Sequence, residues 1–185
     1  MKLHAIALVV LAGCASRSSA SSSPPRLTSA PLDDGQTVEI LEVIDTQQIL
    51  TAQLAVERAS TRETRDFARQ VLLGDSAERT HVLGQAHHAH AEPDASLLVD
   101  LIEKPSRETR GMLSNESGIS FDHFFLTSEV AQKEKEIDWL DHMLIPAARS
   151  TDLRTELAGR RAAALIRIRE ARRLDAELPA NPPRL

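Results

Sequence analysis

Glutamate and histidine residues at helical spacing are the side chains of this chain that could carry out chemistry. Glu78 and His81 lie three positions apart, so in a helix both side chains point to the same face. A site for two metal ions in a helical bundle takes such a pair from each of two helices and a carboxylate from each of the other two. The other candidate ligands are carboxylates on separate helical stretches: Glu57, Glu129 or Glu136, and Glu170. One interpretation is therefore a metal-binding or redox protein.

This set of ligands is incomplete on the last helical stretch. Glu170 has Arg167 three positions before it and Arg173 three positions after it, where a second histidine would be needed. We therefore prefer the interpretation that Glu78 and His81 form a partly exposed polar pair. On this interpretation the folded domain has no resident cofactor.

Further histidines cluster near the end of the stretch that contains His81. His87, His88 and His90 follow it, and His87 can approach His90 across three positions of a helix. Imidazole is a ligand for zinc, copper and nickel, so a surface metal site is one interpretation. The other, which we prefer, is a solvated helix end whose imidazoles interact with the negative end of the helix dipole. A second cluster of acidic residues and a histidine lies near another helix end and has the same two interpretations. It consists of Asp138, Asp141 and His142.

Lysine and arginine residues are the remaining side chains that could take part in binding or catalysis. Lys133 lies within an apolar stripe between Glu129 and Glu136, both within helical reach, which predicts a salt-bridged lysine at the edge of the core. Acidic residues alternate with the arginines of the last helical stretch, which predicts a solvated face rather than a surface for lipid phosphates. Those arginines are Arg160, Arg161, Arg167, Arg169, Arg172 and Arg173. Glycine-rich phosphate loops and a Gly-x-Ser-x-Gly motif are absent from the sequence, so nucleotide binding and acyl transfer have no support.

The composition indicates that helices hold these side chains. Aromatic residues make up 3% of the chain and tyrosine is absent, whereas sheets favour aromatic and β-branched residues. Alanine, leucine, glutamate and arginine, which favour helices, dominate instead. The formal net charge of -5 argues against nucleic acid as a partner. We expect one all-α domain.

Apolar residues recur with a 3.6-residue period in four long stretches. The connection between the second and third, residues 94–116, predicts a crossover of short helices, one of which begins at Pro105. Four antiparallel amphipathic helices with this crossover make a ferritin-like four-helix bundle. A cavity between the helices would indicate a third class of function, the binding of small apolar ligands. The four predicted helices cover residues 36–59, 61–91, 119–146 and 151–178.

The N-terminus predicts a lipid anchor. One lysine precedes an apolar run over residues 5–12, which is too short to span a bilayer as a helix. Leu11-Ala12-Gly13-Cys14 resembles the bacterial lipobox at all four positions. This resemblance implies a signal peptide over residues 1–13, and a diacylglycerol and an acyl chain on Cys14 that hold the chain to a lipid bilayer. Ala15 stands where aspartate would retain a lipoprotein at the inner membrane, which implies the outer membrane.

The remaining segments follow from composition. Residues 14–35 are rich in serine and proline and have little to bury, which predicts a flexible tether. The bundle is predicted to occupy residues 36–178, and residues 179–185 to form a disordered tail. This organisation places the bundle in the cell envelope, facing the periplasm.

The body of the chain resembles the secreted bacterial family catalogued as domain of unknown function 4142. The similarity covers residues 38–174 and is carried by residues 52–60, 66–70 and 121–136, with Glu-Arg-Ala-Ser at a tight helix turn as its most specific part. The resemblance implies a ferritin-like fold. Members commonly have a histidine in the second and third long helices where this chain has Asp75 and Lys133.

The hypothesis from sequence is a membrane-anchored lipoprotein that acts as a non-enzymatic envelope interaction or stress-related module. The partner in the envelope is not encoded in any motif. The alternative is a metal-binding or ferritin-like redox protein.

Overall fold

The computed structural model describes residues 32–86 and 96–180, and these residues contain helices and no strand. The prediction of an all-α helical bundle is confirmed. Within this part of the chain the helices are α1 (Asp34–Arg58), α2 (Arg62–Ala86), α3 (Ser96–Ser114), α4 (Gly118–Trp139), a π-helical segment η1 (Leu140–Leu144), the short α5 (Ile145–Ala147) and α6 (Thr151–Glu177).

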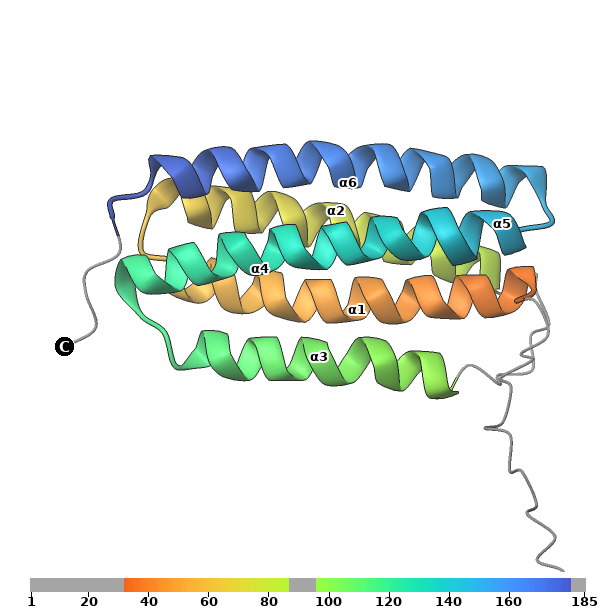
Figure 1. The fold of residues 1–185 in the computed structure, drawn as a ribbon, viewed down its shortest axis with the longest axis horizontal. Coiled ribbons are helices and arrows are strands. Elements are labelled where there is room, and N and C mark those ends of the chain that lie inside the picture. The colour runs from red at the N-terminus through yellow and green to blue at the C-terminus, as the bar shows by residue number, and fades with distance from the viewer. Residues whose placement is uncertain (1–31, 87–95, 181–185) are drawn as a thin grey trace, which may run out of the picture. The chain divides into compact units, whose positions relative to one another are not determined.

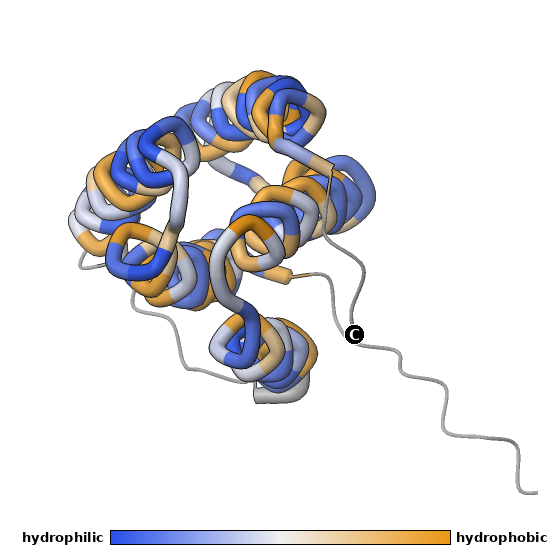
Figure 2. Tube along the Cα trace, turned by 90° about the vertical axis from the view of Figure 1, so that its left-hand side faces the viewer, coloured by the Kyte–Doolittle hydropathy of each residue, from blue (hydrophilic) through white to orange (hydrophobic). Residues whose placement is uncertain are grey.

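Two antiparallel hairpins form the bundle. α1 packs along α2, α4 packs along α6, and α3 lies on the outside against α1 and α4 (Figure 1). Each helix carries hydrophobic and hydrophilic residues around its circumference, as expected for helices with one buried side (Figure 2). α2 and α4 run in the same direction, which is the ferritin-like arrangement (Figure 1).

Hydrogen bonds from backbone amides to aspartate and glutamine side chains fix one end of the bundle. Asp33 accepts a hydrogen bond from the Gln36 amide at 2.8 Å, and the Gln36 side chain accepts one from the Asp33 amide at 3.0 Å, so α1 begins with a capping box. The Asp34 carboxylate accepts hydrogen bonds from the amides of Arg149 and Ser150 at 2.7 and 2.9 Å. These bonds tie the start of α1 to the start of α6.

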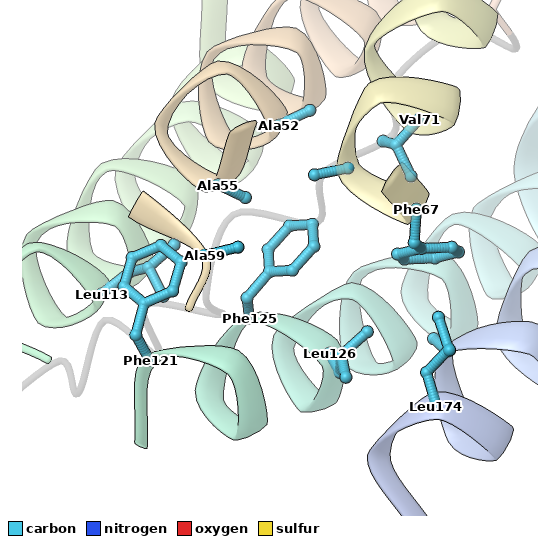
Figure 3. Packing of buried hydrophobic residues seen from close by; sticks show 12 residues of the cluster. Ala52, Ala55, Ala59, Phe67, Val71, Leu113, Phe121, Phe125, Leu126 and Leu174 are labelled. Carbon is cyan, nitrogen blue, oxygen red and sulfur yellow. The ribbon is translucent and has the colours of Figure 1, made fainter. Parts of the chain in front are cut away.

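Two apolar clusters form the core, one toward each end of the bundle. Phe67 of α2 and Phe125 of α4 lie in the first, with ring centroids 6.1 Å apart, and Figure 3 shows α1, α4 and α6 contributing neighbours around them. The second gathers fully buried residues from α1, η1 and α6: Ile40, Leu41, Leu140, Leu144 and Leu157. On each long helix, the residues between these clusters include buried polar and charged side chains.

The crossover differs from the prediction of two short helices. α3 is one helix of 19 residues that continues through Pro105. Proline removes one backbone donor and strains the preceding turn. Pro105 is exposed, and the neighbouring Ser106 hydroxyl donates a hydrogen bond to the Ile102 carbonyl at 2.7 Å. The helix therefore accommodates the proline on its solvent side.

The third long helix ends with a change of hydrogen-bond register. After Trp139 the chain forms the π-helical segment, in which the Ile145 amide donates to the Leu140 carbonyl. Pro146 follows directly and has no amide hydrogen to donate. The wider turn keeps both Leu140 and Leu144 buried. None of the helices in the described ranges has the length and apolar character needed to cross a membrane.

The turn between α1 and α2 is held by the start of α4. The Asp122 carboxylate accepts hydrogen bonds from the amides of Ser60 and Thr61, both at 2.8 Å, and from both hydroxyls. Arg58 donates to the carbonyls of Ser114 and Glu116 at 2.7 and 2.8 Å. The Glu-Arg-Ala-Ser segment is therefore a structural joint that connects the two hairpins.

We expect Asp122→Ala to lower the free energy of unfolding by about 2–3 kcal/mol, because four donors lose a charged acceptor at a buried site. Urea unfolding of the two proteins measures this loss. Asp100→Ala on the exposed side of α3 is the matched control, and we expect it to change stability by less than about 0.5 kcal/mol. Equal stabilities of the two variants would contradict the role of Asp122.

Candidate functional site

A layer of charged side chains crosses the interior of the bundle between the two apolar clusters. All four long helices contribute to it. We call it the charged layer, and it consists of Asp45 and Gln48 from α1, Asp75 and the half-buried Glu78 from α2, Glu129, Lys133 and Glu136 from α4, and Arg160 and the half-buried Arg167 from α6.

Helical spacing directs these side chains inward. Glu129, Lys133 and Glu136 follow one another at intervals of four and three residues, so they share one face of α4, and Phe125 extends that face into the first apolar cluster. Arg160 and Arg167 are seven residues apart on α6, in line with the buried Leu153. The charged residues therefore occupy positions of the buried stripe itself.

Glu136 is the centre of the layer. One carboxylate oxygen accepts hydrogen bonds from Lys133 Nζ and Gln48 Nε2, both at 2.8 Å, and the other accepts one from Arg160 Nε at 2.6 Å. Burial alone would raise the pKa of Glu136, but the charges of Lys133 and Arg160 outweigh it and hold this pKa well below its usual range. Glu136 therefore stays ionised inside the bundle.

Arg160 connects α6 to three other helices, α1, α2 and α4. Its guanidinium forms a two-pronged ion pair with Asp45, with Nη1 3.2 Å from Oδ2, and Nη1 lies 3.3 Å from Glu78 Oε2. Burial raises the pKa of Asp45 to about 6, even though the charge of Arg160 opposes this shift. The exposed fraction of Arg160 is only 7%, so its charge depends on these carboxylates rather than on water.

The other half of the layer is less completely paired. Arg167 Nη1 donates to Asp75 Oδ1 at 2.5 Å and lies 3.8 Å from Glu129 Oε1. The second oxygen of Asp75 and Glu129 Oε1 are buried without a hydrogen-bond partner. Burial raises the pKa of Glu129, with Lys133 and Arg167 opposing it. Gly74 leaves room for this arrangement, because an added Cβ would come within 3.0 Å of Arg167 Nη2.

The charges of the layer do not cancel. Its five carboxylates face three cations, an excess of two negative charges. Asp45 and Glu129 are the two carboxyl groups whose pKa is raised, so they are the groups that take up protons as the pH falls. The arrangement can hold protons and ion pairs, and among its carboxylates Asp75 and Glu129 each keep one oxygen without a hydrogen bond.

The five residues predicted as metal ligands do not come together. Glu57 is exposed on α1, and Glu170 pairs with Arg173 with 2.7 Å between Oε1 and Nη2. His81 is exposed, with its Nδ1 3.0 Å from Glu156 Oε1. Only Glu78 and Glu129 belong to the charged layer. In residues 32–86 and 96–180, no group of three or more His, Cys, Asp or Glu side chains is arranged to hold a metal ion, so this donor set does not fit a dinuclear centre.

The structure describes only some of the other residues that the sequence predicted as sites. Cys14, His87, His88 and His90 lie outside the residues that the structure describes. His142 Nδ1 lies 3.0 Å from Asp138 on an exposed surface, and Asp141 forms an ion pair with Arg161 instead. Lys133 was predicted to be salt-bridged at the edge of the core, and it is 2% exposed and paired with Glu136.

The prediction that all the arginines of α6 lie on a solvated face is wrong for Arg160 and Arg167. Both belong to the apolar stripe, and their cost of burial is offset by carboxylates on other helices. Asp45, a main partner of Arg160, was also missed. Its signal in the sequence is an acidic residue four positions after Leu41, within the buried stripe of α1.

The fold and the layer define a helical bundle whose interior holds ion pairs. Residues 16–174 match the family described as Domain of unknown function (DUF4142), and the chain belongs to this family. No curated protein matches the chain, and no solved structure does.

One further contact of the layer joins Asp75 and Lys133, the two positions at which we expected histidine in relatives. Lys133 Nζ lies 3.9 Å from Asp75 Oδ1. The two positions are thus neighbours inside the bundle, and in this chain an ion pair occupies them.

We expect Arg160→Met to lower the free energy of unfolding by about 3–5 kcal/mol, because it leaves the buried carboxylates of Asp45 and Glu136 without a counter-charge. Arg172→Met on the same helix is the matched control. Arg172 pairs with Glu134 on the surface, so its loss should cost less than about 1 kcal/mol. Chemical denaturation compares the two, and similar losses would mean that the layer is solvated.

The pH dependence of stability follows from the pKa shifts. Between pH 3.8 and about 6, the folded chain holds a proton on Asp45 that the unfolded chain has lost, so the contribution of Asp45 to stability falls as the pH rises. The contribution of Glu136 has the opposite sign, because its lowered pKa stabilises the fold above pH 4.5 and is lost as the pH falls.

We therefore expect the unfolding free energy to be greatest in mildly acidic solution. Between mildly acidic and neutral pH, the contribution of Asp45 to the unfolding free energy should fall by about 3 kcal/mol, which is the energy equivalent of its pKa shift. Urea unfolding across this pH range tests the expectation. Asp45→Asn should remove the part of the fall that Asp45 causes and leave the part due to Glu129, whose pKa is also raised. An unchanged pH profile in this variant would refute the assignment to Asp45.

Proposed function

We propose that this protein is a bacterial lipoprotein whose helical bundle serves as a non-enzymatic envelope interaction or stress-related module. The anchor rests on Leu11-Ala12-Gly13-Cys14, which has every residue type that lipidation and cleavage before Cys14 require. Two or three acyl chains at about 0.8 kcal/mol per buried methylene would hold the chain to its membrane permanently. The tether predicted over residues 14–35 would then end where α1 begins, at Asp34, and hold the bundle on the periplasmic side.

The proposal that the protein is not an enzyme is supported by the charged layer. A dinuclear bundle directs free carboxylates and histidines to a shared centre, whereas here Lys133, Arg160 and Arg167 occupy the space between the carboxylates. In this way the carboxylates of Asp45 and Glu136, and one oxygen of Asp75, are engaged by cationic side chains of other helices or of the same helix. The surface of the bundle is then the part that meets other molecules.

We expect the full chain, produced in a lipoprotein-processing bacterium, to incorporate an alkyne-labelled palmitate and to begin at Cys14 by mass spectrometry. Cys14→Ser should abolish the label and leave the precursor uncleaved. The matched control combines Cys14→Ser with Ser18→Cys, which keeps one thiol but moves it out of the lipobox, and it should also stay unlabelled. A labelled control, or an unlabelled wild-type chain, would refute the anchor.

Sorting and metal content test the rest of the proposal. In an enteric host, the wild-type chain should fractionate with the outer membrane, and Ala15→Asp should retain it at the inner membrane. Stoichiometric iron, zinc or copper in the purified protein, removed by His81→Ala, would overturn the non-enzymatic role. Such a result would establish the metal-binding alternative instead.

A further inference from the structure

His123 near the start of α4 joins that helix to the end of α6. Its Nδ1 lies 2.7 Å from Asp175 Oδ1, and its Nε2 lies 3.0 Å from the backbone carbonyl oxygen of Pro179. The start of α4 and the end of α6 lie at the same end of the bundle (Figure 1), whereas the chain connects these helices at the other end, through η1 and α5. His123 therefore fastens two helix ends that no turn connects.

Both ring nitrogens of His123 face acceptors. A peptide carbonyl can only accept a hydrogen bond, so Nε2 must carry a proton to bond to Pro179. The second contact needs one more proton, either on Nδ1 or on the carboxyl group of Asp175. A carboxyl group gives up its proton far more readily than an imidazole, so this proton resides on the ring. The imidazolium form therefore makes both contacts, and the neutral ring, which has a single N–H, can make only one.

The surroundings of His123 favour the charged form of the ring. The hydrogen bond to the Pro179 carbonyl raises the pKa of His123, and the hydrogen bond and negative charge of Asp175 act in the same direction. Asp122, the preceding residue on α4, adds a second negative charge, and partial burial opposes these effects. The contacts and the charges thus agree on an imidazolium.

The arginines at this end of the bundle are engaged elsewhere. On α6, Arg172 pairs with Glu134, and Arg173 pairs with glutamates of its own helix. Arg58 of α1 and Arg65 of α2 donate to backbone carbonyls. The carboxylates beside His123 therefore act on the ring without competition from these cations.

Loss of one proton from the ring breaks one particular contact. An ionised carboxylate is a stronger acceptor than a peptide carbonyl, so the remaining proton stays on Nδ1, bonded to Asp175. Nε2 then has a lone pair that faces the carbonyl oxygen of Pro179, and two acceptors repel each other. Pro179 therefore separates from His123 when the ring becomes neutral.

Leu178 depends on the contact that is lost. It directly follows the last residue of α6 and is half-buried against the first apolar cluster. Its amide donates to the Asp175 carbonyl at 3.3 Å, beyond the usual range for such bonds. A weak bond on one side and Pro179 on the other thus hold Leu178 in place, so the release of Pro179 exposes this side chain.

We propose that His123 is a pH-sensitive clasp for the C-terminal end of α6. In mildly acidic solution the imidazolium binds Asp175 and Pro179 together and keeps Leu178 on the first apolar cluster. As the pH rises and the ring loses a proton, His123 keeps Asp175, releases Pro179 and lets Leu178 leave the cluster. The clasp is independent of the lipid anchor and of the charged layer.

NMR titration of the isotope-labelled full chain follows both sides of the clasp. Both ring nitrogens of His123 should be protonated at low pH and only Nδ1 at high pH, with a midpoint above the ordinary value of 6.5. The methyl signals of Leu178 should move toward unstructured values at the same midpoint. Exchange of the Leu178 amide, corrected for the intrinsic effect of pH, should become at least about tenfold faster.

Two variants separate the clasp from general fraying of the helix end. Asp175→Asn keeps an acceptor but removes its charge, so it should lower the midpoints of His123 and Leu178 together. His123→Asn places a donor near Nδ1 and none near Nε2, so Leu178 should be released at every pH. His142→Asn is the matched control, because His142 also faces a carboxylate but on an exposed surface, and it should leave the Leu178 titration unchanged.

Three results would overturn the clasp. The first is an unprotonated Nε2 in mildly acidic solution, and the second is a Leu178 signal that does not titrate with His123. The third is equal exchange of the Leu178 amide in the wild type and in His123→Asn below the midpoint, which would mean that packing alone holds the end of α6.

Discussion

Three cations held inside the bundle among carboxylates, two of them buried and one half-buried, are the constraint on which the bundle depends. Moving a charge out of water costs several kcal/mol, and only opposite charges at hydrogen-bonding distance offset this cost. Lys133, Arg160 and Arg167 meet that condition through carboxylates on α1, α2 and α4. A helix that rotated or slid by one residue would separate these pairs. The charged layer therefore determines how the two hairpins lie against each other.

The apolar clusters and the charged layer have different roles. Apolar contacts stabilise any close packing of the helices and distinguish poorly between alternative registers. Ion pairs such as the one between Arg160 and Asp45 form in only one register of the helices. They therefore make the packing specific, whereas the apolar clusters supply the free energy that stabilises it. The excess of carboxylates over cations makes the layer respond to protons, with Asp45 and Glu129 as the responsive groups. The same interior thus couples helix packing to pH.

The residues that resemble the family are mostly structural in this chain. Arg58 and Ser60 build the turn between α1 and α2, and Asp122 fixes that turn to α4. Glu57, next to them, points to solvent. Asp75 and Lys133 lie together inside the bundle as an ion pair. In this chain these residues therefore hold the frame of the fold, and the interior that the frame encloses contains the charged layer.

The sequence by itself determined the helical class, the approximate positions of the helices and the pairing into hairpins, because 3.6-residue periodicity, caps and short turns are local properties. It did not determine that α3 continues through Pro105, since that depends on which side of the helix meets solvent. Nor did it reveal that Arg160 is buried. Its partner Asp45 lies 115 positions away, and such a pair exists only once the rotation of α1 and α6 about their axes is set. Only the tertiary structure decides that rotation, because it results from all the packing contacts together.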